Sequence, residues 1–509
     1  MTLPRWLGPG AVAFVLVWLL LLAGGRSAFL QDPGTFWHTT TGELVLKDGF
    51  IRADPYTFTF AGEWWVPYQW LGEVAMALAH RAGGFDAQLL GAVTVIAAVF
   101  AWLAARLLRT GLHSLLAGGV IALSLAAAGA HFLVRPHLFT LAAMMLVAVA
   151  LAEADVARPR LKRLFWLIPL CVIWTNVHGG VLGGIGTLLV VFAGWVIFWK
   201  LGRPSPLKSW RDVGLLALVA GGCGLSVLVN PYGTDMLKTW RVIMDAPELR
   251  EIIAEHRPLD VTKPYAWPVL ALAAVYLFVL YGVKRSAVRV SWLLPLVWLV
   301  LAFSRCRHAS LFAVVTAVYI TAMWKHARWA LWLAARRPDL YQPGSAEARP
   351  RWAHLWLPAV AVLLALALHA TRTPVPVIGS GWAKHDPDHW PVDALGALKA
   401  NEPKPGEPNK LFNAGYIDGG FVIYHAPGYK VFVDDRCELF GGPWLKEYDE
   451  RTREPGNAVE EWQAKYGRFD FALTRAGTPL DAWFAASAAW EAVPGKPEAK
   501  ATLYKRRAR

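Results

Sequence analysis

The sequence predicts a polytopic α-helical membrane protein that carries a soluble α/β domain at its C-terminal end. Of its 509 residues, 56% are hydrophobic and 17% are charged, whereas soluble domains hold about 25% charged residues. Long apolar runs recur as far as Ala370, and about 20 such residues cross a bilayer. From residue 372 onward the sequence is polar and has no further run of that length. This composition excludes a disordered chain and a disulfide scaffold.

About eleven apolar runs are bounded by polar or basic residues, and each is predicted to be a membrane-spanning helix. The runs near 164–177 and 290–304 are short for a full crossing, so the number of spans carries an error of about one or two. In chain order the runs are 9–25, 87–105, 113–132, 138–153, 164–177, 180–199, 213–229, 265–283, 290–304, 309–324 and 354–370.

The loops between these runs alternate in charge, which predicts the orientation. Short cytoplasmic loops are enriched in Lys and Arg. The N-terminus and the basic loops are therefore predicted to be cytoplasmic, and the C-terminal domain to lie outside. Much of the net charge of +14 then comes from Lys and Arg in the cytoplasmic loops. It gives no reason to expect nucleic-acid binding. The basic loops are 106–109, 158–163, 200–211, 284–289 and 325–337, and the less basic segments are 26–86, 133–137, 230–264 and 305–308.

These patterns divide the chain into a membrane domain over 1–371, with an interfacial first outer loop at 26–86, and an extracytoplasmic α/β domain over 372–509. The periodicity of the second domain predicts short strands separated by helices. The strands are expected at 421–424, 430–433, 469–473 and 501–506, and the helices at 391–400, 456–466 and 480–490.

The first outer loop holds the strongest candidate for chemistry. Asp32 and Pro33 directly follow the first span, and the loop is crowded with Trp and Tyr, which is typical of a segment in the headgroup layer. Such a loop can present an acid to a lipid-held substrate; the alternative is that Asp32-Pro33 only ends a helix. The other polar candidates of the loop are His38, Asp54, Gln69 and Glu73.

Across residues 1–110 this arrangement resembles the GT-C superfamily of integral-membrane glycosyltransferases, which includes protein O-mannosyltransferases and the lipid A aminoarabinose transferase. The shared features are an acid after the first span, small amphipathic helices, and the Trp/Pro-rich segment 64–71. Segments 135–139, 174–180 and 411–436 resemble a little-characterised bacterial branch of such membrane proteins.

The resemblance implies inverting transfer of a sugar from a polyprenyl phosphate, with the first-loop acid as general base. The residue that matches this position is Asp32, and a carboxylate in low-dielectric surroundings suits the role. The superfamily often has two adjacent acids here, whereas this chain has Asp32-Pro33. That departure weakens a metal-binding or paired-acid role at this position.

Two outer loop clusters are candidates for holding the donor phosphate, because the planar guanidinium of Arg donates several hydrogen bonds at once. One contains Arg135 and His137, and the other contains Arg305, Arg307 and His308. Either cluster can instead bind anionic lipid or extend its charges to the headgroup region.

His178 precedes two glycines at a predicted span end, where a ligand can approach the backbone closely. It is a candidate to orient Asp32, to donate to phosphate, or to ligate a metal with His38 and Asp54. A lone His at a membrane edge more often makes an ordinary hydrogen bond. No Cys/His spacing matches a recognised metal site, so no metal or other cofactor is expected to be required.

In the outer domain, Asp434, Asp435 and Arg436 end a predicted strand. A strand-end acid pair is typical of a binding site, and equally of a turn with a local salt bridge. No GxGxxG follows a strand, and there is no Walker loop or Gly-x-Ser-x-Gly elbow, which disfavours nucleotide binding and serine hydrolysis.

The predicted function is a glycosyltransferase at the outer face of a bacterial inner membrane. Its expected partners are a polyprenyl-phosphate-linked sugar and membrane lipids, and its acceptor is not identified. Two alternatives stay open. One is a transporter or channel, which should show paired halves and charges in mid-span. The other is an interaction protein that kept the scaffold and lost the chemistry.

Overall fold

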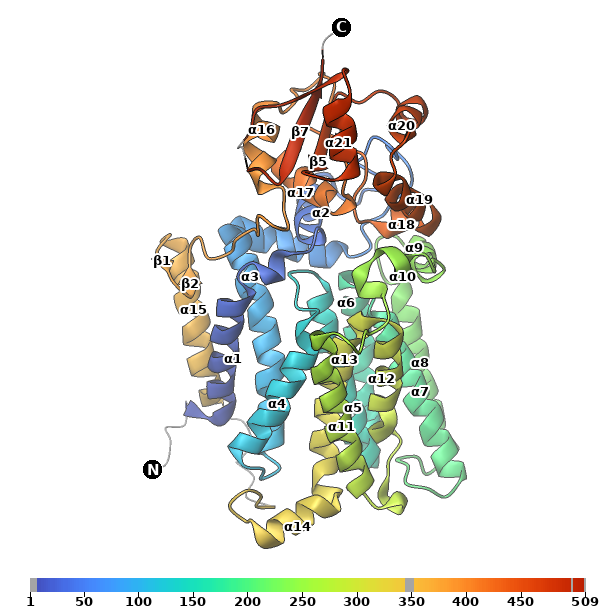
Figure 1. The fold of residues 1–509 in the computed structure, drawn as a ribbon. Coiled ribbons are helices and arrows are strands. Elements are labelled where there is room, and N and C mark those ends of the chain that lie inside the picture. The colour runs from blue at the N-terminus through green and yellow to red at the C-terminus, as the bar shows by residue number, and fades with distance from the viewer. Residues whose placement is uncertain (1–6, 344–351, 496–497, 508–509) are drawn as a thin grey trace.

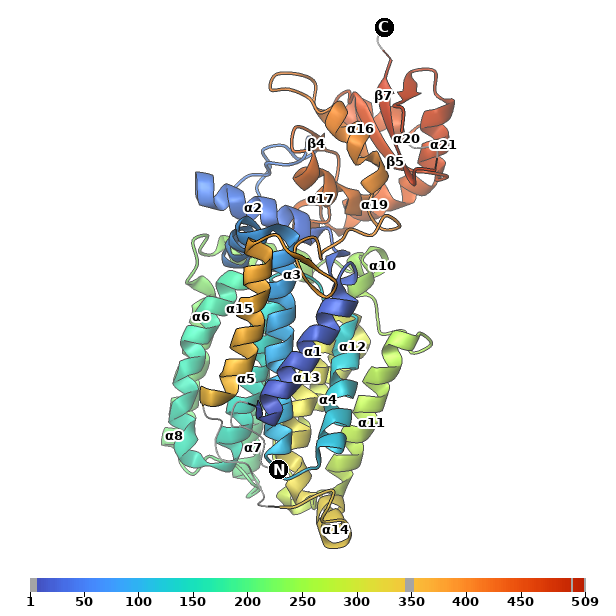
Figure 2. The ribbon, with the colours of Figure 1, turned by 90° about the vertical axis from the view of Figure 1, so that its left-hand side faces the viewer.

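A bundle of long helices carries a smaller α/β domain on one of its ends (Figure 1). The structure is a computed structural model, and it describes residues 7–343, 352–495 and 498–507. The N-terminal end of the described chain lies at the far end of the bundle from the α/β domain (Figures 1 and 2). The predicted fold class, a polytopic helical membrane protein with a C-terminal α/β domain, is confirmed.

Each of the predicted apolar runs is helical. By length and composition, six helical segments of the described residues can cross a bilayer, and four shorter apolar helices accompany them; the number of spans stays a prediction. The bundle consists of α1 (Pro9–Gly25), α3 (Trp70–Leu108), α4 (Ser114–Gly129), α5 (His137–Val156), α6 (Leu167–Val177), α7 (Val181–Lys200), α8 (Trp210–Leu225), α11 (Trp267–Gly282), α12 (Leu294–Ser304), α13 (Ala309–Met323) and α15 (Trp356–Ala370).

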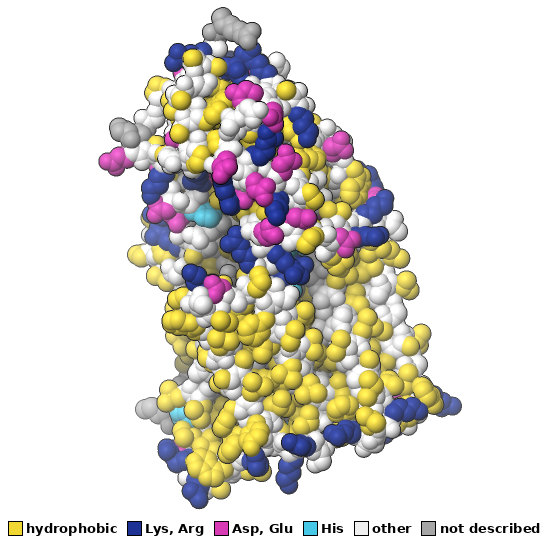
Figure 3. All heavy atoms as spheres, turned by 45° about the vertical axis from the view of Figure 1, so that its right-hand side comes forward, with side chains coloured by type: hydrophobic (Ala, Val, Ile, Leu, Met, Phe, Trp, Pro, Cys, Tyr) yellow, Lys and Arg dark blue, Asp and Glu magenta, His cyan; other side chains and the backbone are white. Residues whose placement is uncertain are grey.

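The surface of the bundle has the pattern expected of a membrane protein. Figure 3 shows a broad hydrophobic band around the helices, with Lys and Arg side chains along the rim farthest from the α/β domain. Acidic side chains gather mainly on the opposite part of the molecule, on and below the α/β domain. This asymmetry agrees with the positive-inside pattern, and the side of the membrane stays a prediction.

The first outer loop forms helices that lie across one end of the bundle. It contains the short turn η2 (Ala28–Leu30), α2 (Gly34–Asp48) and the first part of α3. Gly83 and Gly84 break the helical geometry inside α3, and Gly84 has a φ of +64°, which favours glycine. The chain therefore turns from the interface into the bundle close to residue 86, where the sequence predicts the end of the loop.

Short elements connect the long helices at both ends of the bundle. Ser209 and Asp212 form a reciprocal capping box at the start of α8, which satisfies backbone N–H groups there. The connecting helices are η3 (Arg158–Trp166), η4 (Ser226–Leu228), α9 (Asp235–Met244), α10 (Leu249–Ile252), η5 (Ala254–His256), η6 (Pro264–Ala266), η7 (Arg285–Ala287), η8 (Ser291–Leu293), η9 (Cys306–His308), η10 (Trp324–His326), α14 (Arg328–Arg336) and η11 (Trp352–Leu355).

The outer domain is built on a five-stranded mixed sheet in the order β4-β3-β5-β7-β6. Strand β3 pairs in parallel with β4 and β5, whereas β7 pairs antiparallel with β5 and β6. A separate two-stranded pair, β1 (Pro374–Val375) and β2 (Ile378–Gly379), follows α15. The strands of the sheet are β3 (Lys410–Asn413), β4 (Lys430–Val431), β5 (Phe471–Arg475), β6 (Trp490–Ala492) and β7 (Ala501–Arg506).

Helices cover this sheet, and most of them lie where they are predicted. Those in the ranges 391–400 and 456–466 are confirmed, and the one expected over 480–490 ends at Ala486, before β6. The division into domains at residue 372 stays a prediction. The helices are η12 (Val392–Ala394), α16 (Leu395–Ala400), α17 (Tyr416–His425), α18 (Cys437–Phe440), α19 (Gly442–Arg453), α20 (Ala458–Tyr466) and α21 (Pro479–Ala486).

The predicted strand at 421–424 is wrong, because these residues belong to α17. A short apolar run fits a buried helix as well as a strand, and this one is enclosed between the sheet and the first outer loop. A Cβ on Gly419 would collide with the Val433 carbonyl, and one on Gly420 would lie 2.5 Å from the Pro33 carbonyl oxygen. Gly419 thus lets α17 pack directly on the segment after β4, and Gly420 lets it pack on the segment that holds Asp32.

Candidate active site

Asp32 and Arg135 form an ion pair at the junction of the bundle and the outer domain. Arg135 Nη1 donates to Asp32 Oδ2 at 2.9 Å, and the Gly34 backbone N–H donates to Asp32 Oδ1 at 2.7 Å. A Cβ on Gly34 would lie 2.6 Å from Asp32 Oδ1 and 3.0 Å from Arg135 Nε. Only glycine fits here, and Asp32 itself is 8% exposed.

Two further hydrogen bonds fasten together the loops that carry this pair. The Val134 N–H donates to the Phe29 carbonyl at 2.8 Å. Thr35 Oγ1 donates to the Val134 carbonyl at 3.0 Å. Because these bonds flank Asp32 on one side of the pair and Arg135 on the other, the ion pair has a fixed geometry.

The burial of the pair sets its protonation. Burial raises the pKa of Asp32, and the charge of Arg135 opposes this rise. Burial alone would lower the pKa of Arg135, but the negative charges of Asp32 and Glu255 raise it above its ordinary value. Arg135 is therefore a permanent cation, and Asp32 is a stronger base than an exposed carboxylate.

Glu255 is a site residue that sequence reasoning missed. Its Oε2 lies 3.9 Å from Arg135 Nη1 and its Oε1 lies 3.5 Å from Arg307 Nη1. His131 Nδ1 lies 3.9 Å from Oε2, and His256 Nε2 lies 3.8 Å from Oε1. Although burial opposes it, the charges of Arg135, His131 and Arg307 hold the pKa of Glu255 far below its usual range. Two guanidinium groups therefore enclose one anionic group.

His178 lies in the turn between α6 and α7 with a defined tautomer. Its Nδ1 accepts from the Gly180 N–H at 2.9 Å and lies 2.8 Å from Thr140 Oγ1. Because Nδ1 accepts from Gly180 it carries no proton, so the Thr140 hydroxyl, which accepts from Trp174 Nε1 at 2.8 Å, is the donor to Nδ1. Burial, with the charge of Arg135, lowers the pKa of His178 to about 3. The neutral ring therefore carries its proton on Nε2.

The outer domain contributes a carboxylate to the same region. Asp435 follows β4, and its Oδ1 accepts from Trp37 Nε1 at 2.7 Å. Burial and the negative charge of Asp32 raise the pKa of Asp435, and its charge also contributes to the raised pKa of Arg135. Asp435 therefore acts electrostatically on both members of the ion pair.

Asp54, Asp434 and Arg436 form a different group, which joins the first outer loop to the outer domain. Arg436 Nη2 donates to Asp54 Oδ1 and to Asp434 Oδ2, both at 2.6 Å, and all three side chains are buried. The guanidinium also lies over the rings of Trp65 and Tyr56, at 4.5 and 5.0 Å. The three charges are paired within this group, which fits a fastening role, although Arg436 Nη1 has no hydrogen-bond partner among the described residues.

His38 and Glu73 form a second buried polar pair, with His38 Nδ1 2.9 Å from Glu73 Oε1. Neither His38 Nε2, Glu73 Oε2 nor the nearby Gln69 Oε1 has a hydrogen-bond partner among the described residues. Burial and the charge of Arg135 lower the pKa of His38 well below its ordinary value. The pair lies in the layer of α2 and α3, beneath Trp37.

The other predicted residues lie around the Glu255 cluster or against helix ends. His137 Nε2 lies 2.9 Å from the His131 carbonyl, and His308 Nδ1 lies 3.0 Å from the Leu301 carbonyl. Arg307 Nη1 also lies 2.9 Å from His256 Nε2. Burial and the like charge of Arg307 lower the pKa of Arg305.

The three residues considered as metal ligands each contact a different partner. His38 contacts Glu73, Asp54 contacts Arg436, and His178 contacts Thr140. In the part of the chain that the structure describes, no group of three or more His, Cys, Asp or Glu side chains is arranged to hold a metal ion.

Comparison with known proteins finds no matching family model and no matching curated protein. The solved structures that match include two of ArnT from Cupriavidus metallidurans. The apo structure has 15% identity and a TM-score of 0.49, and the structure bound to undecaprenyl phosphate has 14% identity and a TM-score of 0.46. Each match covers 97% of both chains. At these values the matches bear neither on the activity nor on the ligands of this chain.

Proposed function

We propose that this chain is a membrane glycosyltransferase that moves a sugar from a polyprenyl-phosphate donor to an acceptor hydroxyl at the outer face of a bacterial inner membrane. The observation that carries the proposal is the Asp32–Arg135 ion pair at 2.9 Å, with Arg307 joined to it through Glu255. It brings a candidate base and two candidate phosphate-binding cations into one partly buried cluster. The resemblance of residues 1–110 to GT-C enzymes supports the same assignment.

The chemistry requires Arg135 to exchange one anionic partner for another. When the donor phosphate takes the place of a carboxylate beside Arg135, Asp32 Oδ2 becomes free to accept a proton. The acceptor oxygen attacks the anomeric carbon while Asp32 takes its proton. The bond between that carbon and the phosphate oxygen breaks, and Arg135 and Arg307 stabilise the departing phosphate. The configuration at the anomeric carbon inverts.

The neighbouring residues have supporting roles in this proposal. The Nε2–H of neutral His178 is a donor suited to a phosphate or sugar oxygen. Asp435 places an outer-domain carboxylate near the base, where it raises the pKa of Arg135.

The test is transfer from radiolabelled undecaprenyl-phosphate sugars by the full chain in liposomes. Asp32→Asn keeps the size of the side chain but removes the base, so transfer is expected to fall by about 10²- to 10⁴-fold. Donor binding, measured separately by equilibrium dialysis in detergent, is expected to persist.

Full transfer by Asp32→Asn would contradict the assignment of the base. Sugar flux into wild-type liposomes without covalent transfer would favour a transporter. If the wild type neither transfers nor binds any polyprenyl-phosphate sugar, the chain is a non-catalytic scaffold. Asp86→Asn serves as the control, because Asp86 lies outside the charged cluster and accepts from the backbone N–H groups of Gly381 and Ala383.

A further inference from the structure

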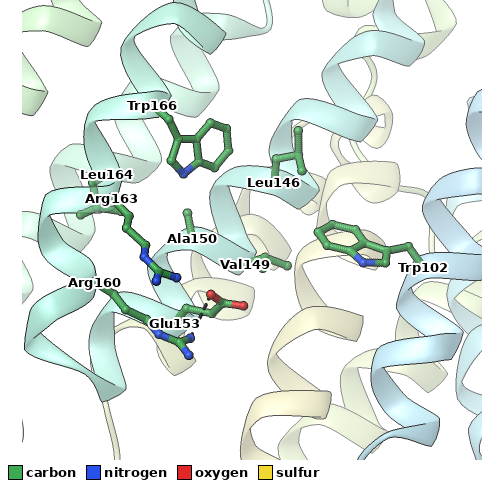
Figure 4. Close-up of a pocket in the computed structure, with 9 residues that line it drawn as sticks. All are labelled: Trp102, Leu146, Val149, Ala150, Glu153, Arg160, Arg163, Leu164 and Trp166. Atoms are coloured by element: carbon green, nitrogen blue, oxygen red, sulfur yellow. Dashed lines mark ion pairs between the residues drawn. The ribbon is translucent and has the colours of Figure 1, made fainter. Parts of the chain in front are cut away.

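A second charged pocket lies at the opposite end of the bundle from Asp32. Helix α5 begins beside Arg135 and ends at this pocket, which opens between α3, α5 and η3 and has a volume of about 420 Å³, part of it open to solvent. Figure 4 shows two arginines of η3 that extend toward the acid on α5. The lining residues are Trp102, Leu146, Val149, Ala150, Glu153, Arg160, Arg163, Leu164 and Trp166.

The charges around this pocket do not balance. Glu153 is shared, because its Oε2 lies 2.9 Å from Arg160 Nη1 and its Oε1 lies 3.3 Å from Arg106 Nη1. Arg163 is exposed, and no ion pair is recorded for it among the described residues. Three guanidinium groups therefore face a single carboxylate, which leaves an excess of positive charge at the mouth of the pocket.

The rest of the lining is apolar and aromatic. Leu146, Val149 and Ala150 of α5 form one wall, and Trp102 and Trp166 stand on either side of it (Figure 4). Trp166 is 40% exposed, as is typical of tryptophan at the level of lipid headgroups. The apolar wall thus continues from the charged mouth toward the hydrocarbon-facing part of α5.

We infer that this pocket binds the phosphate of an anionic phospholipid, with an acyl chain along the apolar wall. Arg160 and Arg163 donate to the phosphate oxygens, for which the guanidinium fork is well suited. A free phosphate ion would use the same arginines but not the wall of α5 and the two tryptophans, which is why a lipid is the better occupant. Basic pockets between helices on the cytoplasmic side are a recurrent site for anionic headgroups.

The test uses the full chain in nanodiscs of phosphatidylcholine and phosphatidylglycerol, with retained lipid counted by native mass spectrometry. Arg160→Gln/Arg163→Gln is expected to lower phosphatidylglycerol retention on the order of tenfold or more, since two charges near the headgroup are lost. Arg163→Gln alone, which breaks no recorded contact, is expected to lower it about threefold. The matched control is Lys208→Gln/Arg211→Gln, which removes two exposed charges on another basic loop.

An equal loss of phosphatidylglycerol in the control pair would overturn the proposal, because the attraction would then belong to the whole basic rim.

The source of the phosphate is tested by thermal unfolding in detergent. Phosphatidylglycerol is expected to raise the Tm of the wild type but not of Arg160→Gln/Arg163→Gln, and inorganic phosphate is expected to raise neither. An equal rise with inorganic phosphate would indicate a free-anion site and overturn a lipid site. Neither assay depends on the proposed transferase activity.

Discussion

At the scale of single residues, the candidate site depends on the contacts among four charged side chains, two carboxylates and two guanidinium groups. Arg135 contacts Asp32 at 2.9 Å and approaches Glu255 at 3.9 Å. Glu255 in turn reaches Arg307 at 3.5 Å. Each arginine is therefore already neutralised by a carboxylate of the chain. An incoming phosphate must compete with Glu255, so this residue should tune both donor affinity and the strength of the base.

Replacing Glu255 by Gln removes one negative charge beside Asp32, whose pKa Glu255 raises. The pKa of Asp32 should fall, so the acid limb of the pH dependence of kcat/KM should move to lower pH. The donor KM should also fall several-fold, because Arg135 and Arg307 lose a competing anion.

Glu251→Gln is the matched control, since Glu251 lies in the same segment but pairs with Lys446. Steady-state transfer over a range of pH values measures both effects. A variant with the wild-type pH profile and the wild-type donor KM would show that Glu255 has no part in the site.

At the scale of secondary-structure elements, the position of Asp32 depends on close packing between α2 and α17. Gly420 lies against Pro33, the residue after Asp32. The Asp32 side chain in turn accepts from the Gly34 N–H at the start of α2. A displacement of α17 should therefore shift Pro33 and, with it, the adjoining Asp32.

Gly420→Ala introduces a Cβ only 2.5 Å from the Pro33 carbonyl oxygen. Overpacking of this kind costs about 1–3 kcal/mol, and a displacement of about 1 Å at a reacting group can cost about 10²-fold in rate. Transfer should therefore fall by one to two orders of magnitude, with a lower Tm. Gly396→Ala in α16 meets no atom within 4 Å and should keep wild-type activity. Equal activity of the two variants would count against this packing argument.

At the scale of the whole molecule, the site needs parts of both domains. Asp32 comes from the first outer loop, Arg135 from the bundle, and Asp435 from the outer domain. The buried Asp54–Arg436–Asp434 group holds the first and last of these together. Breaking such a buried pair typically costs about 3–5 kcal/mol, so separation of the two domains is not expected during a reaction cycle.

The interface between the first outer loop and the outer domain should become less stable at low pH. His385 and His425 pack on Phe36 of α2, with ring centroids 5.2 and 5.5 Å away. Burial lowers the pKa of His385 to about 4, and burial with the nearby His385 and Lys399 lowers that of His425 to about 3. Below about pH 6.5 these two histidines bind protons in the unfolded chain but not in the folded chain. Stability should therefore fall as the pH drops from 7 toward 5.

Thermal unfolding at a series of pH values checks this expectation. The Tm of His385→Phe/His425→Phe should fall less between pH 7 and 5 than that of the wild type. His113→Asn, at the start of α4 where the side chain accepts from the Leu115 N–H, is the control and should behave like the wild type. An unchanged slope in the double Phe variant would exclude these two histidines as the cause.

The sequence predicts the helices of the bundle because long apolar runs carry that signal locally. It also predicts Asp32, Arg135 and Arg307 as candidates, because acids and arginines at span ends are conspicuous. Glu255 could not be found this way, since Arg135, His131 and Arg307, which surround it in space, are far from it in the chain. The same reason explains the error over 421–424, where the helix packs on Val433 through Gly419 and, across the domain interface, on Pro33 through Gly420.

The contact between Asp54 and Arg436 joins residues that are 382 positions apart. At a synthesis rate of about 5–20 residues per second, Asp54 waits about 20–80 seconds for its partner to be made. During that interval the first outer loop holds the Asp54 carboxylate without the Arg436 guanidinium that neutralises it. The contact that fastens the first outer loop to the outer domain can therefore form only after Arg436 has been made.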